Sequence, residues 1–345
     1  MPSELSPDTL IREVVERYPG AEKVFGAHGL PCAGCHVSTR ESIRGGAGAH
    51  RLDLDALMGD LQKFIAGGTV PPQRKPPAGE ARTPPPATAR KPGIEHVVAI
   101  MSGKGGVGKS VVTALLAVAL RRRGLRVGIL DADITGPSQA KMFGITARPH
   151  VDAEKKLHPP ASRTGIPIMS MNLVLENETQ AVIWRGPMIS QAIRQFYTDF
   201  EWGKLDYLLV DLPPGTSDAP LTVLQALPVA GVVLVSTPQG LATMIVSKAV
   251  KLVQQLHAPV IGLVENMAYF VDPATGNRFE LFGPSKGVQL VVESGAPLLA
   301  QLPIDPPLTQ LCDEGRVEDY QSSEYDWLVE NFLKVLPMPV VAASH

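Results

Sequence analysis

One segment limits the fold of this chain more than any other: an apolar run followed at once by a glycine-rich turn. The run, His96-Val97-Val98-Ala99-Ile100-Met101, is rich in β-branched residues, which is typical of a buried strand. The turn is Gly103-Lys104-Gly105-Gly106-Val107-Gly108-Lys109-Ser110, which matches the phosphate-loop pattern G-x-x-x-x-G-K-S/T, and an apolar segment suited to a helix, 111–123, follows. The glycines let backbone amides close around phosphates at a helix N-terminus. Strand, turn and helix together therefore predict a nucleotide-binding site.

The last two residues of the turn have predicted roles in this site. Lys109 is expected to reach the β- and γ-phosphates of ATP, and the Ser110 hydroxyl is expected to hold Mg²⁺. Catalysis by phosphate-loop proteins depends mainly on positioning and charge stabilisation. The sequence therefore predicts an enzyme, an ATPase.

Two later apolar runs, 127–131 and 207–211, each end in an aspartate, and Asp133 follows the first of them. An acid just past the carboxyl end of a parallel strand lies at the crevice where open α/β sheets bind ligands. We interpret Asp133 as the residue that orients the attacking water and Asp131 as structural. Asp211 is expected to meet Mg²⁺, often through water. The Pro213-Pro214-Gly215 segment that follows Asp211 is a candidate for a loop that senses the γ-phosphate.

The remainder of the large domain alternates apolar strands with helices. Strands are predicted at 232–236, 260–266 and 297–302, and a helix at 241–256. Because each crossover places a helix on a sheet face, this order predicts an α/β fold with a mostly parallel, doubly wound sheet and helices on both faces.

Length and composition predict a second, smaller domain. At about 150 residues per domain, 345 residues correspond to two domains. Prolines and charged residues dominate 66–93, which we interpret as a linker. It separates a small all-α domain, 1–65, from an ATPase domain, 94–336, with a tail at 337–345.

Charge and hydropathy exclude several classes of function. The net charge is −2, so the chain as a whole has no electrostatic preference for nucleic acid or an anionic membrane. No apolar run reaches the roughly 18 residues of a membrane span. The N-terminus carries charged residues where a signal peptide is apolar, which predicts a cytoplasmic protein. Ser322–Leu336 is acidic, unlike a helix that docks on membranes.

Three helices are predicted in the N-terminal domain. The first is expected to start at Ser6-Pro7-Asp8, which combines a capping hydroxyl, proline and an acid. The second is expected over 21–27. The third, which is amphipathic, is expected over 54–65 behind Asp53.

Two of the three cysteines form the motif Cys32-Ala33-Gly34-Cys35-His36. This spacing lets both sulfurs face one metal ion or iron–sulfur cluster, and His28, His36 or a second copy would supply the remaining ligands. Three alternatives are a turn without a ligand, a redox pair and a c-type haem attachment. Cys312, in a predicted helix behind two prolines, is interpreted as a small buried residue.

Four segments together resemble the Mrp (ApbC-like) iron–sulfur cluster carrier ATPases. They are 131–138 (DADITGPS), 184–188 (WRGPM), 206–218 and 265–270 (ENMAYF), and the resemblance covers 93–319. It implies ATP binding and slow hydrolysis, a homodimer, and delivery of clusters to apo-proteins or exchange with an assembly scaffold. It also implies that Asn266 contacts adenine, whereas the residues alone allow Asn266 to cap backbone groups. The N-terminal segment resembles small helical domains that carry a Cys-x-x-Cys-His turn.

Lys104 adds a second resemblance, to the deviant Walker A class that includes MinD. In that class this lysine reaches the nucleotide of a partner subunit, which again implies a homodimer. The alternative is a solvated lysine.

The chain departs from the carrier pattern after Phe270. Carriers have a Cys-x-x-Cys pair there, but Asp272 and Thr275 stand at these positions, and both are poor ligands for an iron–sulfur cluster. Three functions follow: a cluster carrier in which Cys32 and Cys35 replace or supplement the missing pair, a MinD/ParA-type positioning ATPase, or a metal-free ATPase with an N-terminal adaptor.

Overall fold

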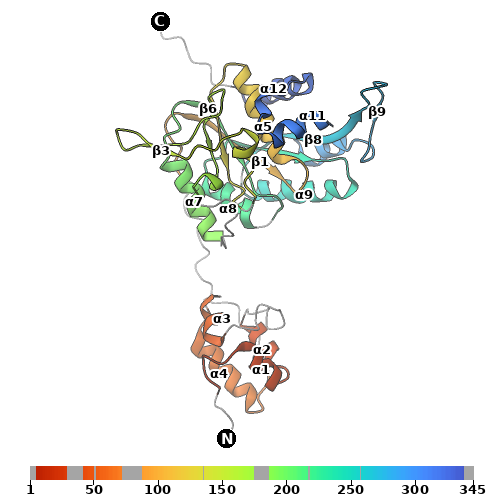
Figure 1. Cartoon of the computed structure of the whole chain (residues 1–345). Coiled ribbons are helices and arrows are strands. Elements are labelled where there is room, and N and C mark those ends of the chain that lie inside the picture. The colour runs from red at the N-terminus through yellow and green to blue at the C-terminus, as the bar shows by residue number, and fades with distance from the viewer. Residues whose placement is uncertain are drawn as a thin grey trace. The chain divides into compact units, whose positions relative to one another are not determined.

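The computed structural model describes residues 5–28, 42–49, 52–71, 88–134, 136–174, 186–216, 218–256 and 258–337. The contacts divide the chain into two units, 1–83 and 84–345, shown in Figure 1. The predicted motif at Cys32 and Cys35, most of the predicted linker and the tail from residue 338 lie outside the described residues. The exact domain boundaries stay a prediction.

The first unit is helical. Its elements are α1 (Ile11–Arg17), α2 (Ala21–Ala27), α3 (Ile43–Ala49) and α4 (Leu54–Ile65). They enclose a small apolar core that includes Phe25, Ile43 and Leu57. The helix predicted over 54–65 is confirmed as α4, and Asp53 caps it, since its carboxylate accepts a hydrogen bond from the Ala56 N–H at 3.0 Å.

The start predicted for the first helix is wrong, because α1 begins at Ile11 rather than at Ser6-Pro7-Asp8. The Ser6 N–H donates to the Thr9 hydroxyl at 3.1 Å, and Leu10 forms an isolated bridge with Ser42. The turn and the bridge hold this stretch in a non-helical conformation, which illustrates how side-chain hydrogen bonds compete with helix formation.

The second unit is built on a central sheet of the order β10-β8-β7-β1-β6-β2-β5, with the short β9 antiparallel to β8. All other pairs in this sheet are parallel, so the predicted sheet is confirmed. The strands are β1 (Ile94–Ser102), β2 (Val127–Asp131), β5 (Ile168–Met169), β6 (Leu205–Asp211), β7 (Gly231–Ser236), β8 (Val260–Val271), β9 (Arg278–Phe279) and β10 (Leu298–Ile304). A separate hairpin joins β3 (His150–Val151) and β4 (Leu157–His158).

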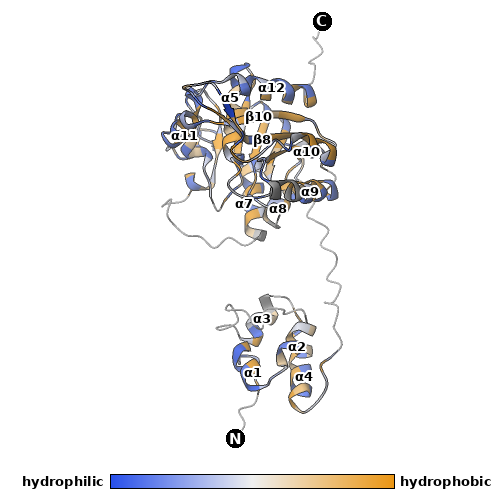
Figure 2. Ribbon diagram, turned by 90° about the vertical axis from the view of Figure 1, so that its right-hand side faces the viewer, coloured by the Kyte–Doolittle hydropathy of each residue, from blue (hydrophilic) through white to orange (hydrophobic). Residues whose placement is uncertain are grey.

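Helices cover both faces of this sheet. They are α5 (Lys109–Arg122), α6 (Gln139–Met142), α7 (Gly186–Thr198), α8 (Asp218–Ala226), α9 (Gly240–Gln255), α10 (Gly287–Ser294), α11 (Pro306–Asp313) and α12 (Ser323–Val335), with short 3₁₀ turns at Met171–Leu173 and Val317–Asp319. In Figure 2 the apolar residues gather along the strands and on the helix sides that face them. None of the described helices is long and apolar enough to span a membrane.

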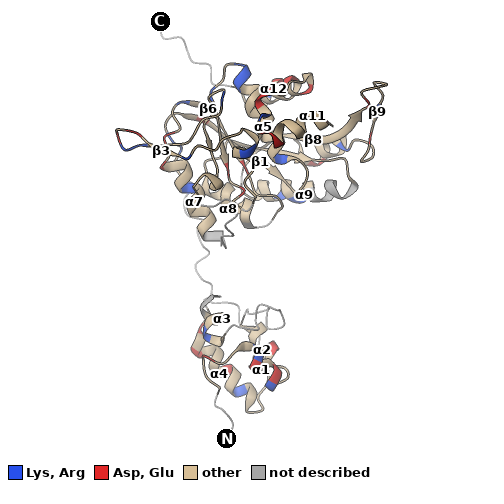
Figure 3. Ribbon diagram, in the orientation of Figure 1, with Lys and Arg blue, Asp and Glu red and all other residues tan. Residues whose placement is uncertain are grey.

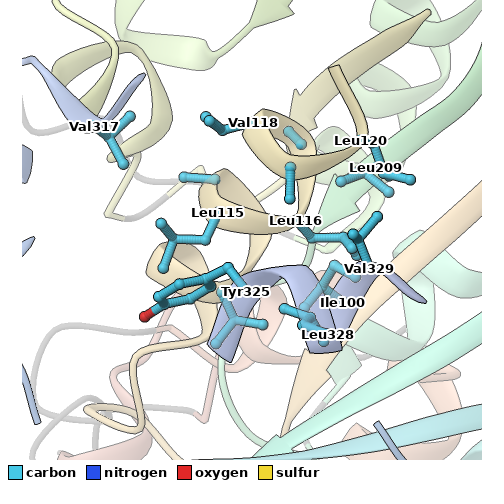
Figure 4. Close-up of a cluster of buried hydrophobic side chains, with 14 of the residues drawn as sticks. Ile100, Leu115, Leu116, Val118, Leu120, Leu209, Val317, Tyr325, Leu328 and Val329 are labelled. Carbon is cyan, nitrogen blue, oxygen red and sulfur yellow. The ribbon is translucent and has the colours of Figure 1, made fainter. Parts of the chain in front are cut away.

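Successive residues of β1 show why both faces of the sheet are covered by helices. Val98 and Ile100 join the core beneath α5, α11 and α12, whereas Val97 and Ala99 join the core beneath α7, α8 and α9. Figure 4 shows Ile100 with Leu116 of α5 and Leu328 of α12. Because side chains alternate along a strand, a continuous apolar run is buried on both sides.

Candidate functional site

The phosphate loop and two aspartates meet at the carboxyl edge of the sheet. β1 lies next to β6, which lies next to β2, and the register pairs Ile100 with Asp211 and Asp131 with Asp211. The loop 103–108 leaves β1 at this edge and leads into α5. The topology therefore brings together segments that are about 100 residues apart in the chain.

Two glycines of the loop adopt a backbone conformation that other residues rarely take. Gly106 has φ of 77° and Gly108 has φ of 80°. A Cβ atom on Gly108 would lie 2.2 Å from the Nδ2 atom of Asn266. Gly108 is thus required both for the turn and for the close approach of Asn266.

Lys109 and Asp211 form a buried ion pair. The Lys109 ammonium also lies 3.3 Å from the Ser110 hydroxyl, so the structure brings together the three predicted residues. The carboxylate of Asp211 accepts two further hydrogen bonds, from the Thr113 hydroxyl at 3.2 Å and from the Gln139 amide at 2.8 Å. Asp211 is fully buried, so these partners compensate for its lost hydration.

Asp131 is bonded to the loop that follows β2. Its carboxylate accepts hydrogen bonds from the Ser138 N–H at 2.9 Å, the Gln139 N–H at 3.0 Å and the Ser170 hydroxyl at 3.0 Å. Complete burial and the nearby charge of Asp211 raise the pKa of Asp131 to about 7. These contacts support the interpretation of Asp131 as a structural residue.

Asp133 is buried at the same edge, and its carboxylate accepts a hydrogen bond from the Gly136 N–H at 3.3 Å. Its predicted role in orienting water stays a prediction.

Lys104 lies at the start of the loop, where its ammonium donates a hydrogen bond to the side-chain oxygen of Gln239. Its carbonyl accepts a bond from the Ser102 hydroxyl at 3.0 Å. Lys104 is therefore held by the residue that precedes α9, and its predicted reach across a dimer stays a prediction.

Asn266 touches the phosphate loop from β8. Its amide donates to the Val107 carbonyl at 2.9 Å, so it caps a backbone group, one of the two roles considered for it. The adjacent Met267 has φ of 54°, and the pairing of β8 with β10 shifts register at this point. This bulge directs Asn266 toward the loop.

Behind the bulge, the fully buried Glu265 joins β8 to the segment that starts α10. Its carboxylate accepts hydrogen bonds from the Ser285 hydroxyl at 2.5 Å, the Lys286 N–H at 2.7 Å and the Gln301 amide at 2.8 Å. These bonds fix the strand immediately before Asn266.

The predicted phosphate-sensing segment also lies beside the loop. The Gly215 N–H donates to the Ser102 carbonyl at 3.0 Å, and Gly215 has φ of 96°. A Cβ atom on Gly105 would lie 3.9 Å from the side chain of Pro214. The segment 213–215 therefore lies next to the phosphate loop, and its role in sensing the γ-phosphate stays a prediction.

The segment that replaces the expected cysteine pair forms the loop of the β8–β9 hairpin. Asp272 accepts hydrogen bonds from the Ala274 N–H at 2.9 Å and from the Thr275 hydroxyl at 2.7 Å. The Thr275 bond is the main reason that the pKa of Asp272 is lowered. Both residues therefore stabilise a turn.

His28, considered as a metal ligand, is buried and bonded to Asp60 of α4, with 3.0 Å between Nε2 and the carboxylate oxygen. One ring nitrogen is thus engaged. Within the described residues, no group of three or more His, Cys, Asp or Glu side chains is arranged to hold a metal.

Cys312 is buried in α11, and burial raises the pKa of its thiol to about 11. The thiol is thus protonated at neutral pH, in agreement with its interpretation as a small buried residue.

Sequence reasoning missed Thr113 and Gln139, the two neutral donors to Asp211. Thr113 lies one helical turn after Lys109, so its spacing offered a signal. Gln139 belongs to no pattern, since only the fold of the loop after β2 brings it to Asp211.

Comparisons with known proteins agree with this geometry. A model of the family described as NUBPL iron-transfer P-loop NTPase matches residues 93–336, and a model of a domain of unknown function, DUF1858, matches residues 5–58. The iron-sulfur cluster carrier protein of Clostridium perfringens is 44% identical over 234 residues, which cover 66% of this chain and 82% of that protein. The carrier protein of Pseudomonas fragi is 45% identical over 67% of this chain and 81% of its own length.

Solved structures show the same fold. A nucleotide-binding protein of Archaeoglobus fulgidus in complex with ADP has 45% identity and a TM-score of 0.61, over 68% of this chain and 91% of that one. The cell division ATPase MinD of Pyrococcus furiosus, at 21% identity and a TM-score of 0.51 over 70% of this chain and 99% of its own, shares the fold. With its family model spanning most of the chain, this protein belongs to the NUBPL-like iron-transfer family of P-loop NTPases.

Proposed function

We propose that this protein binds and hydrolyses ATP and uses that cycle to carry iron–sulfur clusters to apo-proteins or from an assembly scaffold. The observation that carries the proposal is the buried network of Lys109, Asp211 and Ser110 beneath a phosphate loop. The names of the relatives supply the cargo, since those proteins are described as iron-sulfur cluster carriers. A cytoplasmic location belongs to the proposal as well.

The oxygen donors at the site suit Mg²⁺. The hydroxyl of Ser110 and the carboxylate of Asp211 are the hard ligands that this ion prefers, with Asp211 acting through water. Bound there with ATP, Mg²⁺ would neutralise charge on the phosphates. The chemistry of the donor set therefore fits the ion.

The residues of the chain have separate roles in hydrolysis. Lys109 leaves Asp211 and turns to the β- and γ-phosphates, while the amides of 105–110 bind the phosphate oxygens. Asp133 orients the attacking water. The segment 213–215, which is bonded to Ser102 at the end of β1, moves when the γ-phosphate departs.

A homodimer forms the working unit in this proposal. Lys104 exchanges its bond to Gln239 for the nucleotide of the partner subunit. Lys104→Ala is expected to lower turnover and to abolish ATP-dependent dimerisation, as measured by size-exclusion chromatography with light scattering. A variant that still dimerises with ATP would contradict this part of the proposal.

The cluster is cargo, and Cys32 and Cys35 are the proposed ligands. The hairpin residues Asp272 and Thr275 have no thiol to offer to iron, and their side chains are bonded to each other in a turn. The buried thiol of Cys312 is protonated. Cys32 and Cys35 thus remain as the paired thiols of the chain.

Anaerobic reconstitution with iron and sulfide tests the cargo. The wild type is expected to gain cluster absorption in the visible range, and Cys32→Ser/Cys35→Ser is expected to lose it. Cys312→Ser is the matched control, which should absorb like the wild type. A wild type without absorption would favour the metal-free ATPase whose N-terminal domain is an adaptor.

The positioning ATPase receives less support. In Figure 3 the ribbon of α12 carries red, acidic positions; Glu324 and Asp326 lie in its first turn and Lys334 in its last. A membrane-docking helix is basic on its polar face. Co-sedimentation with anionic vesicles in the presence of ATP is therefore expected to be absent.

A further inference from the structure

The side chain of Gln139 has an arrangement that no motif accounts for. It is fully buried at the first residue of α6, and its amide nitrogen donates two hydrogen bonds, to the Asp211 carboxylate at 2.8 Å and to the Ser110 carbonyl at 2.9 Å. Its amide oxygen has no hydrogen-bond partner among the described residues. A buried polar atom without a partner is uncommon, and its cost in stability calls for an explanation.

The orientation of this amide follows from chemistry. Both neighbouring groups, a carboxylate and a carbonyl, are acceptors, so only the NH₂ end of Gln139 can face them. The oxygen end must then point away from both acceptors, and it is buried without a hydrogen-bond partner among the described residues.

Nucleotide binding increases the importance of these bonds. In this structure the Asp211 carboxylate is neutralised by Lys109, which must turn away to reach a phosphate. Asp211 is then a buried carboxylate whose remaining partners are the Thr113 hydroxyl and the Gln139 amide. Charge-assisted hydrogen bonds of this kind are stronger than neutral ones.

We propose that Gln139 is a positioning residue of the magnesium–nucleotide site. Its NH₂ group holds Asp211 at a fixed distance from Ser110, and its oxygen accepts a hydrogen bond from a water molecule bound to Mg²⁺. The inference rests on the proposed function, since it requires that Mg²⁺ and nucleotide bind at this edge. It adds a residue that comes from α6 rather than from the phosphate loop or from β6.

The structure gives the inference a specific consequence. The Gln139 side chain is bonded to Asp211 and to the backbone of Ser110, and within the described part of the chain its amide makes no hydrogen bond to the glycines of the phosphate loop. Its loss should therefore weaken the contribution of Mg²⁺ to nucleotide affinity and leave affinity without Mg²⁺ unchanged.

Titration with the fluorescent nucleotide mant-ADP, once with Mg²⁺ and once with EDTA, measures this contribution. In Gln139→Met, which keeps the volume and removes the amide, the ratio of the two dissociation constants is expected to fall about tenfold, as for a lost hydrogen bond to a charged group. The affinity in EDTA is expected to match the wild type. Gln310→Met, which removes an exposed amide from α11, is the matched control and should leave both values unchanged.

A second variant separates positioning from folding. Gln139→Glu keeps an acceptor oxygen but places a carboxylate beside Asp211, so it is expected to reduce the Mg²⁺ effect at pH 8 and to recover part of it at pH 6, where a protonated glutamic acid can donate. Equal Mg²⁺ effects in wild type and Gln139→Met would overturn the inference, as would a parallel loss of affinity in EDTA. A wild type that binds no mant-ADP would refute the proposed function instead.

Discussion

The carboxyl edge of the sheet and the β8–β9 hairpin are both connected to β8, yet their polar residues differ. Around the phosphate loop, Lys109, Asp211 and Gln139 are buried and bonded across three separate segments of the chain. In the hairpin, Asp272 and Thr275 are bonded to each other within one turn at the surface. The first arrangement depends on the whole fold, whereas the second is local.

This difference separates the two halves of the proposed activity. Buried groups that are hydrogen-bonded across several segments hold their geometry without a ligand, which suits a site that must position phosphate and water. A surface turn tolerates exchange of its residues, so a cysteine pair can be absent there while the ATPase site is kept. The comparison predicts large effects from changes at the edge and small effects from changes in the hairpin.

The largest effect is expected for Lys109→Ala. The variant removes the cation that meets the phosphates and leaves Asp211 buried without its ion pair. Turnover of ATP is expected to fall by about a thousandfold or more, as when a group that stabilises developing charge is lost. A coupled-enzyme phosphate-release assay measures it, and Lys248→Ala on α9 is a control outside the site. Normal turnover in Lys109→Ala would remove the assignment of this site.

Asn266→Ala changes the residue by which β8 contacts the phosphate loop. The change leaves the Val107 carbonyl without its partner, and affinity for ATP is expected to fall about tenfold. If Asn266 contacts adenine, ATP should lose more affinity than inosine triphosphate, which differs at the base. Equal losses for both nucleotides would show that Asn266 acts by capping the loop alone.

Much of the fold could be predicted because it depends on local patterns. The strand at 127–131 is found as predicted, and the helix predicted at 241–256 is observed as α9, Gly240–Gln255. Continuous apolar runs, turns and glycines carry this information along the chain. The start of α1 was not predictable in this way, since the bridge from Leu10 to Ser42 depends on a contact 32 residues away.

The same difference between local patterns and contacts distant in sequence applies to the candidate site. The roles suggested for Lys109 and Ser110 came from a motif that is contiguous in sequence. Gln139 was not found, because its contact with Asp211 joins residues 72 positions apart and glutamine has no characteristic spacing. The bulge at Met267 likewise arises from the pairing of β8 with β10 rather than from local sequence.

Asp131 is expected to make stability depend on pH, with a smaller effect than the changes above. Its pKa is raised from 3.8 to about 7 by burial and by the charge of Asp211. Between these values the folded protein keeps a proton that the unfolded chain has released, so the free energy of unfolding should decrease as pH rises through this range.

Urea denaturation of the nucleotide-free protein at several pH values measures this slope. In Asp131→Asn the titrating group is absent, so the wild type should lose stability relative to the variant between pH 4 and 7. Asp313→Asn is the control. It changes an exposed residue of α11, the one that follows Cys312 in the sequence, and should follow the wild type. Parallel curves for wild type and Asp131→Asn would contradict the expected slope.

The smallest effect is expected for Asp272→Ala in the hairpin. The change removes the acceptor of the Ala274 N–H and of the Thr275 hydroxyl, so the Ala274 amide should exchange its hydrogen about fivefold faster, as for one weak hydrogen bond. ATP turnover is expected to equal that of the wild type, because these bonds do not extend to β8 residues at the phosphate loop. Hydrogen exchange followed by mass spectrometry measures the first quantity and the phosphate-release assay the second. A marked fall in turnover would mean that the hairpin and the carboxyl edge are coupled through β8. The contrast between a site bonded across several segments and a local turn would then no longer hold.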